Sequence, residues 1–439
     1  MKRLRLAIVI AFVLALTVPL TASAQDGLTY NSGFQVQNLE GEVATIQIVF
    51  YNQDGTVEAT VNDTIAANDS NTYFPLGAVD EGFNGSVVIS SDRDVRAIAN
   101  VLANGLDFGA SYSGFTEGAE MVALPLLMYE NSGFTTWFNV QNAGEEATDV
   151  MVQYSDGQTA QCLNLQPGAA CTLDQADEGH AAGWVGAGLV TADEPVVVTV
   201  MEVGATTLFG YGGFAQASAE VAMPLINANN AGYQTGVQIQ NTGAVPTTVT
   251  VAYTPSTAGT ACTETRTIGA LSSETFALQA FATDIAESTC IPGATFVGSA
   301  MVTVNTAGTD LVAIVNQLNL EANKGAAYEG FDPATATDSV VMPLIMDRNG
   351  GYFTGFGVSN VGTTTTEVLC TFTDTAHTEG ATLAPGQSLT RVQNNQIADG
   401  YVGSATCVAD ADGLIIGVVN QLNPVLPGDT LLVYNAFNN

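Results

Sequence analysis

The sequence predicts an all-β protein made of four tandem Ig-like antiparallel β-sandwich domains behind a cleaved signal peptide. A strand-like segment that ends in Asn recurs four times, at Asn38, Asn142, Asn241 and Asn360, in steps of 104, 99 and 119 residues. Between these markers, short β-branched or alternating runs are separated by Gly, Pro, Asn and Asp about every 8–12 residues, which is typical of antiparallel sandwiches. Because about a hundred residues can bury a core, we expect each repeat to be one domain.

The first 24 residues have the composition of a secretory signal. Three basic residues stand within the first five, and residues 6–20 form an apolar run that is short for a membrane span. A small-residue cleavage motif ends at Ala24, so we expect the mature chain to start at Gln25. The predicted location is therefore extracellular, with the protein secreted or held at the cell surface.

The repeat spacing divides the chain into the signal and four units, numbered 1 to 4 below. The expected boundaries are 1–24 for the signal, 25–120 for unit 1, 121–220 for unit 2, 221–338 for unit 3 and 339–439 for unit 4. Each unit should hold about seven strands. We expect the units to lie in line, because the connections between them are short.

Two segments of fixed spacing recur along the chain. A Pro-Leu pair lies inside an apolar run, at Pro125, Pro224 and Pro343. An aromatic residue follows nine positions after each Pro, at Phe134, Tyr233 and Tyr352. This residue leads into the strand that ends in the marker Asn.

The rest of the unit adds further strands and their turns. A β-branched run such as 248–253 comes next, and a Pro-Gly turn follows at residues 167–168 and 385–386, where Pro presets φ and Gly accepts positive φ. An aromatic residue then precedes a strand of small residues, at Phe83, Trp184, Phe296 and Tyr401. An apolar run such as 311–317 and a closing Tyr-x-x-Phe motif complete the unit, with Tyr at positions Tyr112, Tyr211, Tyr328 and Tyr434.

Several motifs of unit 4 carry a resemblance to a known group of proteins. They are MPLIM at 342–346, NGGY at 349–352, TG at 354–355, NVG at 360–362, LAPGQS at 383–388 and GYVGS at 400–404. With these motifs the mature chain resembles uncharacterised secreted bacterial proteins built from tandem Ig-like β-sandwich repeats. The resemblance implies a surface or matrix role and brings no catalytic residues with it.

The chain is strongly acidic, with nine Lys and Arg residues against 43 Asp and Glu and a formal net charge of −34. Nucleic acid is therefore not an expected partner, because binding it needs clustered basic residues. The acids are spread along the chain, as on the solvated surface of an extracellular protein. No apolar run after residue 24 is long enough to span a bilayer, so we expect no membrane insertion.

The six cysteines are distributed in pairs. Unit 1 has none, and the later units each have two, namely Cys162 and Cys171, Cys262 and Cys290, and Cys370 and Cys407. An even number per unit behind a signal predicts one disulfide within each of these units. No pair has the CxxC spacing of zinc or thioredoxin-like sites.

The sequence contains no recognisable catalytic motif, and we expect the protein not to be an enzyme and to need no cofactor. Its two histidines, His180 and His377, are 197 residues apart, and a Ser-His-Asp triad would need one of them. The nucleophile-elbow, zinc-protease and P-loop patterns are all missing. We expect both histidines to lie on surface loops.

An acidic turn follows the small-residue strand in every unit. In unit 4 it contains Asp410, Asp412 and Gly413, and oxygen ligands at alternate positions suit a hard cation such as calcium. The other positions of a calcium loop are absent, and Asp and Gly are also what hairpin turns prefer. Both interpretations stay open: simple turn chemistry, and weak calcium binding by Asp410 and Asp412.

The repeated aromatic residues also allow two interpretations. Side chains such as Tyr233, Tyr352 and Trp184 recur at fixed places in the units. They could belong to the apolar cores, or they could form a platform that stacks on sugars.

Three Pro-Leu segments serve four units, which predicts an incomplete sheet at one end of the chain. Counting nine residues back from Tyr30 in unit 1 reaches Thr21, inside the signal. If the segment opens each unit, cleavage removes the first strand of unit 1; if it closes each unit, unit 4 lacks its last. Either arrangement leaves an edge that can template strand addition, unless that edge is short or covered.

These observations favour a secreted, non-enzymatic cell-surface or extracellular-matrix protein that acts in adhesion, scaffolding or assembly. Its expected partners are a protein or glycan at the cell surface, and further copies of itself through a terminal domain edge. The alternative is a carbohydrate-binding or other ligand-binding module, which calcium would support.

Overall fold

The computed structural model describes the backbone of residues 10–14 and residues 27–104, 107–277, 287–305, 308–410 and 412–438. Apart from one short 3-10 helix, η1 (Pro333–Thr335), the regular structure of these residues consists of antiparallel strands, so the predicted all-β class is confirmed. No helix among the described residues has the length and apolar character needed to cross a bilayer. The predicted cleavage site at Ala24 and Gln25 lies outside the described residues.

Unit 1 forms two four-stranded sheets with an apolar core between them. One sheet has the order β1-β6-β3-β4 and the other β5-β2-β7-β8. The strands are β1 (Ile10–Leu14), β2 (Tyr30–Asn38), β3 (Ala44–Asn52), β4 (Val57–Ile65), β5 (Ser70–Tyr73), β6 (Gly85–Ser91), β7 (Val95–Ala103) and β8 (Phe108–Ser113). Alternate residues of β3, such as Ile46, Ile48 and Phe50, are buried, as expected for a strand with one face on the core.

Units 3 and 4 repeat this strand order. Unit 3 has β16-β21-β18-β19 and β20-β17-β22-β23, and unit 4 has β27-β26-β29-β24-β32 and β28-β25-β30-β31. The strands of unit 3 are β16 (Glu220–Ala228), β17 (Gln234–Asn241), β18 (Thr247–Ala258), β19 (Cys262–Ile268), β20 (Ser273–Phe276), β21 (Phe296–Val304), β22 (Leu311–Asn319) and β23 (Lys324–Glu329). Those of unit 4 are β24 (Ser339–Asp347), β25 (Phe353–Asn360), β26 (Thr366–Phe372), β27 (Thr378–Leu383), β28 (Ser388–Gln393), β29 (Tyr401–Ala409), β30 (Ile415–Leu422), β31 (Leu431–Asn435) and β32 (Phe437–Asn438).

Unit 2 differs in that one long strand belongs to both of its sheet halves. β14 (Trp184–Val203) pairs with β11 and β9 along its first half and with β10 and β15 along its second. The other strands are β9 (Ala119–Tyr129), β10 (Thr135–Asn142), β11 (Thr148–Tyr154), β12 (Thr159–Leu165), β13 (Ala170–Asp174) and β15 (Leu208–Gly212). The two halves of β14 therefore occupy the positions of the sixth and seventh strands of the other units.

The Pro-Leu segments open their units. They form β9, β16 and β24, which pair with β14, β21 and β29 of the same unit. The corresponding place beside β6 in unit 1 is taken by β1, which lies within the predicted signal. With this opening strand, units 1 and 3 have eight described strands each, one more than the expected number.

The marker Asn at the end of each second strand has a structural reason. Its Nδ2 donates to a backbone carbonyl four residues later at the same distance in all four units, 2.7 Å, with Asn38, Asn142, Asn241 and Asn360 as donors. Its Oδ1 accepts a hydrogen bond from the backbone N–H two residues on. The buried carboxamide thus shapes the loop that follows the strand.

The three predicted disulfides are present. They join Cys162 to Cys171, Cys262 to Cys290 and Cys370 to Cys407, each within one unit. Cys370 and Cys407 lie opposite each other in the register of β26 and β29.

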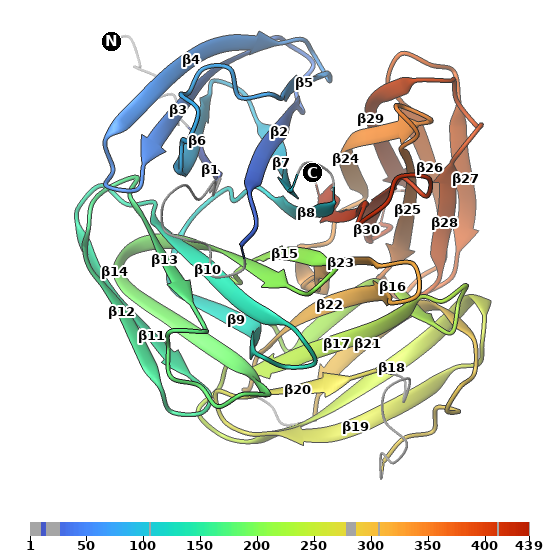
Figure 1. Cartoon of the computed structure of the whole chain (residues 1–439). Coiled ribbons are helices and arrows are strands. Elements are labelled where there is room, and N and C mark those ends of the chain that lie inside the picture. The colour runs from blue at the N-terminus through green and yellow to red at the C-terminus, as the bar shows by residue number, and fades with distance from the viewer. Residues whose placement is uncertain are drawn as a thin grey trace, which may run out of the picture.

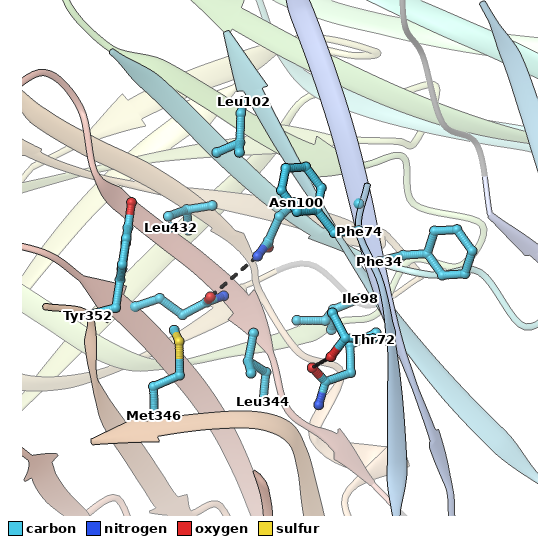
Figure 2. Close-up of a pocket in the computed structure, with 13 residues that line it drawn as sticks. Phe34, Thr72, Phe74, Ile98, Asn100, Leu102, Leu344, Met346, Tyr352 and Leu432 are labelled. Atoms are coloured by element: carbon cyan, nitrogen blue, oxygen red, sulfur yellow. Dashed lines mark hydrogen bonds between the residues drawn. The ribbon is translucent and has the colours of Figure 1, made fainter. Parts of the chain in front are cut away.

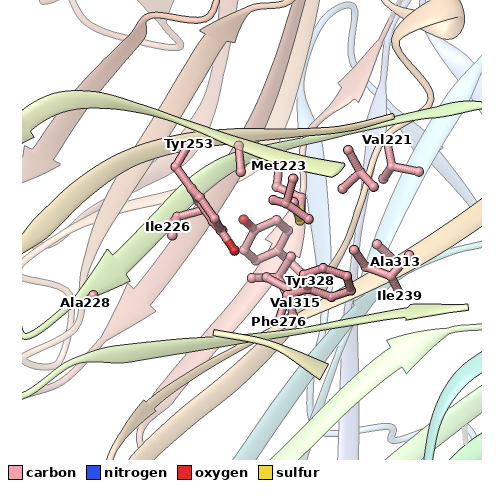
Figure 3. Packing of buried hydrophobic residues seen from close by; sticks show 14 of the residues in the cluster. Val221, Met223, Ile226, Ala228, Ile239, Tyr253, Phe276, Ala313, Val315 and Tyr328 are labelled. Carbon is pink, nitrogen blue, oxygen red and sulfur yellow. The ribbon is translucent and has the colours of Figure 1, made fainter. Parts of the chain in front are cut away.

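The units close into a ring, so the expected arrangement in line is wrong (Figure 1). Each apolar core includes residues of the following unit: Met201 packs in the core of unit 1, Ile314 in that of unit 2 and Val418 in that of unit 3. The series returns to its start, because Ile98 of unit 1 packs in the core of unit 4. Figure 3 shows the core of unit 3, where Tyr253 gathers with aliphatic side chains.

The last strands of the units meet at the centre of the ring. β8 contacts β15 and β31, and β23 contacts the same two strands. Most residues of β15, β23 and β31 are buried, which is possible because these strands are covered on both faces. The runs of apolar residues at consecutive positions in β15 and β31 follow from that position.

Candidate functional site

Neighbouring units meet through a pair of side chains that recurs at the same register around the ring. Between units 2 and 3, Asn316 Nδ2 donates to Glu202 Oε2 at 2.6 Å. Between units 3 and 4, Gln317 and Asn420 exchange two hydrogen bonds of 3.4 Å. Between units 4 and 1, Asn100 Nδ2 donates to Gln421 Oε1 at 3.4 Å.

The contact between units 4 and 1 contains a partly open cavity of about 210 Å³ (Figure 2). Most of its wall is apolar, with Ile98 and Leu102 from β7 facing Leu344 and Met346 from β24. The aromatic rings of Tyr352 and Phe74, together with Leu432, complete the apolar part of the wall, and Asn100 and Gln421 supply an amide pair. We call this space the 4/1 cavity.

Gln35 fixes one side of the 4/1 cavity. Its Nε2 donates to Pro343 O of unit 4 at 2.6 Å and to Ser70 Oγ at 2.8 Å, and its Oε1 accepts from Thr72 Oγ1 at 2.8 Å. The carboxamide is therefore fully occupied and holds the two units at a fixed separation. Asn100 Oδ1 and Gln421 Nε2, in contrast, have no hydrogen-bond partner among the described residues.

A second cavity of about 260 Å³ lies at the equivalent place between units 3 and 4. It is lined by Tyr233, Phe356 and Leu422, with the Gln317–Asn420 pair closed upon itself. Between units 1 and 2 the position of Gly33 and Gly355 is occupied by Trp137, whose ring packs edge-on against Tyr30 at 5.7 Å. This contact therefore contains a cavity between units 4 and 1 and between units 3 and 4, whereas the Trp137 ring fills it between units 1 and 2.

Two of the repeated aromatic residues line these cavities. Tyr352 and Tyr233 are partly exposed at the walls of the two cavities, while Phe134 packs against Phe209 at 5.4 Å. Trp184 stacks on the imidazole of His180. Tyr352 and Tyr233 therefore have the exposure that a ligand platform needs, whereas Phe134 and Trp184 pack against other rings of their unit.

Asp429 connects all four units at one end of the central strands. Its side chain is 1% exposed, and its carboxylate accepts from the backbone N–H of Leu208 at 3.1 Å and of Gly325 at 3.0 Å. Its own N–H donates to Asp107 O at 2.6 Å. Burial raises the pKa of Asp429 to about 8, although these N–H groups act in the opposite direction.

Glu329 and Asn435 connect the units at the other end. Glu329 Oε1 accepts from Gly212 N at 2.6 Å, and its backbone exchanges two hydrogen bonds with the Asn435 side chain at 2.8 and 3.2 Å. Ser113 Oγ of unit 1 donates to Asn435 O at 3.3 Å. Burial raises the pKa of Glu329 above its usual range. Neither polar cluster was anticipated from the sequence, where Glu329 and Asp429 stand among many acids.

The calcium candidates Asp410 and Asp412 lie in the turn between β29 and β30. Asp410 Oδ2 accepts from Glu367 N at 3.2 Å, and Asp410 O accepts from Gly413 N at 2.8 Å. Asp412 has a φ of 82°, which is the turn geometry that Asp tolerates. Among the described residues, no three His, Cys, Asp or Glu side chains gather into a group that could hold a metal ion.

The expectation that both histidines lie on surface loops is wrong for His180. Its side chain is buried, and its ring stacks on Trp184 with centroids 3.7 Å apart. Nδ1 pairs with Asp156 Oδ2 at 2.7 Å and Nε2 with Gln175 Oε1 at 3.0 Å, so both ring nitrogens are occupied. His180 therefore ties the loop between β13 and β14 to the turn between β11 and β12. His377 is half-buried beside Glu379.

Comparisons with known proteins give no family for this chain. No family model matches it, and no curated protein matches it. One solved structure to which it is similar is the crystal structure of Thermotoga maritima 1070, at 17% identity over 23% of this chain and 96% of that chain, with a TM-score of 0.20. A likeness with so low a TM-score carries no argument about the protein.

Proposed function

We propose that this protein is a secreted, non-enzymatic component of the cell surface or extracellular matrix that acts in adhesion, scaffolding or assembly. In this proposal residues 1–24 are a cleaved signal, and the four units are Ig-like domains with the boundaries given above. The closed ring supports it most directly, because cores shared between neighbouring units make a stiff body that holds its outer loops at fixed spacing. The three disulfides and the acidic composition suit an extracellular environment.

Fractionation of a producing culture followed by intact-mass measurement and electron microscopy tests this proposal. We expect the protein in the medium or on the cell surface, starting at Gln25, as particles that join into larger assemblies at native abundance. A cytoplasmic protein that retains residues 1–24 contradicts the secretion. Isolated particles at every concentration contradict the role in assembly.

The 4/1 cavity favours a second function, the binding of a carbohydrate or another small ligand. Its wall combines aromatic rings, which can stack on a sugar ring, with amide groups, which can bond sugar hydroxyl groups. The variant Asn100→Met/Gln421→Val gives the 4/1 contact the residues that the chain itself uses between units 1 and 2, Met201 and Val101. We expect discrete hits on a glycan array for the native protein and their loss in this variant.

The control for the array is the variant Asn420→Met/Gln317→Val, which makes the same change in the cavity between units 3 and 4. It should keep the hits if the 4/1 cavity is the binding site. Repeating the array with a chelator tests whether calcium supports the binding. An array without hits for the native protein leaves scaffolding as the function.

A further inference from the structure

The space beside β6 distinguishes unit 1 from the other units. In units 2, 3 and 4 the corresponding strand pairs with a Pro-Leu strand that belongs to the mature chain. In unit 1 it pairs with β1, residues 10–14, which the signal proposal removes. Without β1, β6 is an edge strand whose outward N–H and C=O groups have no partner strand.

The backbone register shows that β1 takes the same place as the Pro-Leu strands. The residues opposite the matching positions of β6, β14, β21 and β29 are Phe12, Val122, Val221 and Val340, and two places later they are Leu14, Leu124, Met223 and Met342. Val122, Val221 and Val340 are all buried. The place beside β6 is therefore built for an extended segment with apolar residues at alternate positions.

A buried tyrosine of unit 1 is equivalent to one that bonds the Pro-Leu strand in each of the other units. In units 2, 3 and 4 the tyrosine of the last strand donates through Oη to the backbone carbonyl of the Leu that follows Pro, at 2.7, 2.6 and 2.8 Å from Tyr211, Tyr328 and Tyr434. The equivalent Tyr112 is 1% exposed; among the described residues its Oη bonds no carbonyl of an opening strand, and the Thr199 side chain of unit 2 lies beside it. The backbone of an opening strand that carries Leu at this position would supply the carbonyl acceptor that the other three tyrosines have.

The place beside β6 is one strand wide. On the side away from the sixth strand, the Pro-Leu strands contact the Phe of the closing motif, through Ala123 with Phe214, Ala222 with Phe331, and Val341 with Phe437. Unit 1 carries the same motif, with Phe115 at the matching position. The place beside β6 is therefore bounded on both sides. It has room for one peptide strand, and the sheet cannot be extended further by adding more strands.

We propose that, after removal of the signal, unit 1 is completed by a strand donated from a partner protein, with two alternate apolar residues followed by Pro-Leu. This rests on the secretion proposed above. Units 2, 3 and 4 each hold a Pro-Leu strand of this type at the equivalent place. A second copy is a poor donor, because its Pro-Leu strands are each held by a neighbouring strand, a closing Phe and a tyrosine hydroxyl. Backbone pairing would provide affinity, and the alternate apolar side chains would provide specificity.

The test adds a synthetic peptide, residues 339–347 of unit 4 (SVVMPLIMD), to the protein purified from the medium. Hydrogen exchange is followed in β6, with β21 and β29 as internal references. We expect fast exchange in β6 alone, protection of β6 when the peptide is added, and a rise in melting temperature. A peptide with Val340→Asp and Met342→Asp should do neither, because its charges would face the core.

A hydroxyl deletion separates strand insertion from adhesion of the peptide elsewhere. Tyr112→Phe removes the group that would bond the donated backbone and should weaken peptide binding about fivefold, the equivalent of one net hydrogen bond. Tyr328→Phe, which lies under the resident strand of unit 3, should leave peptide affinity unchanged. Equal effects of the two variants overturn the proposal.

The same measurements distinguish the other occupants. Protection of β6 in a monomer that starts at Gln25 means that the chain fills the place itself, and protection in a dimer means that a second copy does. Either result overturns donation by a partner. A purified chain that retains residues 1–24 overturns the proposed secretion instead, with β1 left in place.

Discussion

Glu202 makes stability depend on pH in the direction opposite to that of most surface carboxyl groups. It is fully buried between units 2 and 3, and burial raises its pKa from 4.5 to about 8. Between those values the folded protein holds a proton that the unfolded chain releases, so its stabilising contribution is complete below pH 4.5 and is lost as pH rises toward 8. The expected slope is up to about 1.4 kcal/mol per pH unit.

The substitution Glu202→Gln should remove this contribution, because the amide keeps the hydrogen bond with Asn316 and does not ionise. Denaturant unfolding at intervals from pH 5 to pH 8 measures it. We expect the free energy of unfolding to change less with pH in the variant. The variant and the native protein should differ less at pH 5 than at pH 8. Asp429 and Glu329 also have raised pKa values and should leave a residual slope of the same sign. Identical profiles would contradict the assignment to Glu202.

For single residues, the sequence indicated which positions matter better than it indicated which side chains contact each other. Asn142 and its equivalents were recognised as markers because they recur, and their role in the following loop appears once their carboxamides are seen bonded to backbone. The sequence predicts a surface loop for His180, which lies in a segment rich in Gly and acidic residues. Its burial depends on Tyr154 and Asp156, which belong to another part of the unit and meet His180 only when the unit folds.

Among the structural elements, the disulfides should differ in how much they stabilise the fold. The Cys370–Cys407 bridge spans 37 residues and Cys162–Cys171 spans nine. In the chain-entropy model, loops of these lengths correspond to about 4 and about 2.5 kcal/mol. Replacing each pair with Ala should therefore lower the free energy of unfolding more in unit 4 than in unit 2, as measured by guanidinium unfolding.

Reducing agent provides the matched control for the two cysteine variants. If the difference arises from the bridges, the native protein and both variants should converge when all disulfides are reduced. A larger loss for the Cys162–Cys171 pair would mean that local packing outweighs loop length at these sites.

The sequence predicted most strands, because β-branched runs bounded by Gly, Pro and Asn determine them locally. It also contained a signal for the ring that could have been used. Segments such as β22 and β31 are apolar at consecutive rather than alternate positions, which indicates burial of both faces. A sandwich standing alone buries one face of each strand, so these segments required a neighbour.

At the scale of the whole molecule, shared cores predict a compact particle. A folded chain of this length should have a radius of gyration of roughly 22 Å, whereas four separate domains in line would exceed about 40 Å. Small-angle scattering of the monomer should give the smaller value. The larger value would contradict the ring.

Asp429 should stabilise the entire ring and not unit 4 alone. Asp429→Ala leaves the backbone N–H groups of Leu208, Gly325 and Leu431 without an acceptor, at about 1 kcal/mol each. We expect a loss of about 3 kcal/mol in denaturant unfolding and faster hydrogen exchange in β15 and β23 as well as in β31.

The exposed Asp410 offers a control of the same residue type within unit 4. Asp410→Ala removes one hydrogen bond at the surface and should change stability by less than about 1 kcal/mol. Faster exchange confined to unit 4 in the Asp429 variant would show that the contacts to units 2 and 3 carry little energy.

Cyclic sharing of cores also fixes how many copies of the unit the chain can contain. In a linear array a duplicated or deleted unit changes the length and leaves every junction as it was. In this ring the junctions together turn the chain through a full circle, so a ring of three or five units would require the junctions to change their angles. The lineage of this protein could therefore alter loops and cavities one unit at a time, while recombination that gains or loses a whole unit would be eliminated.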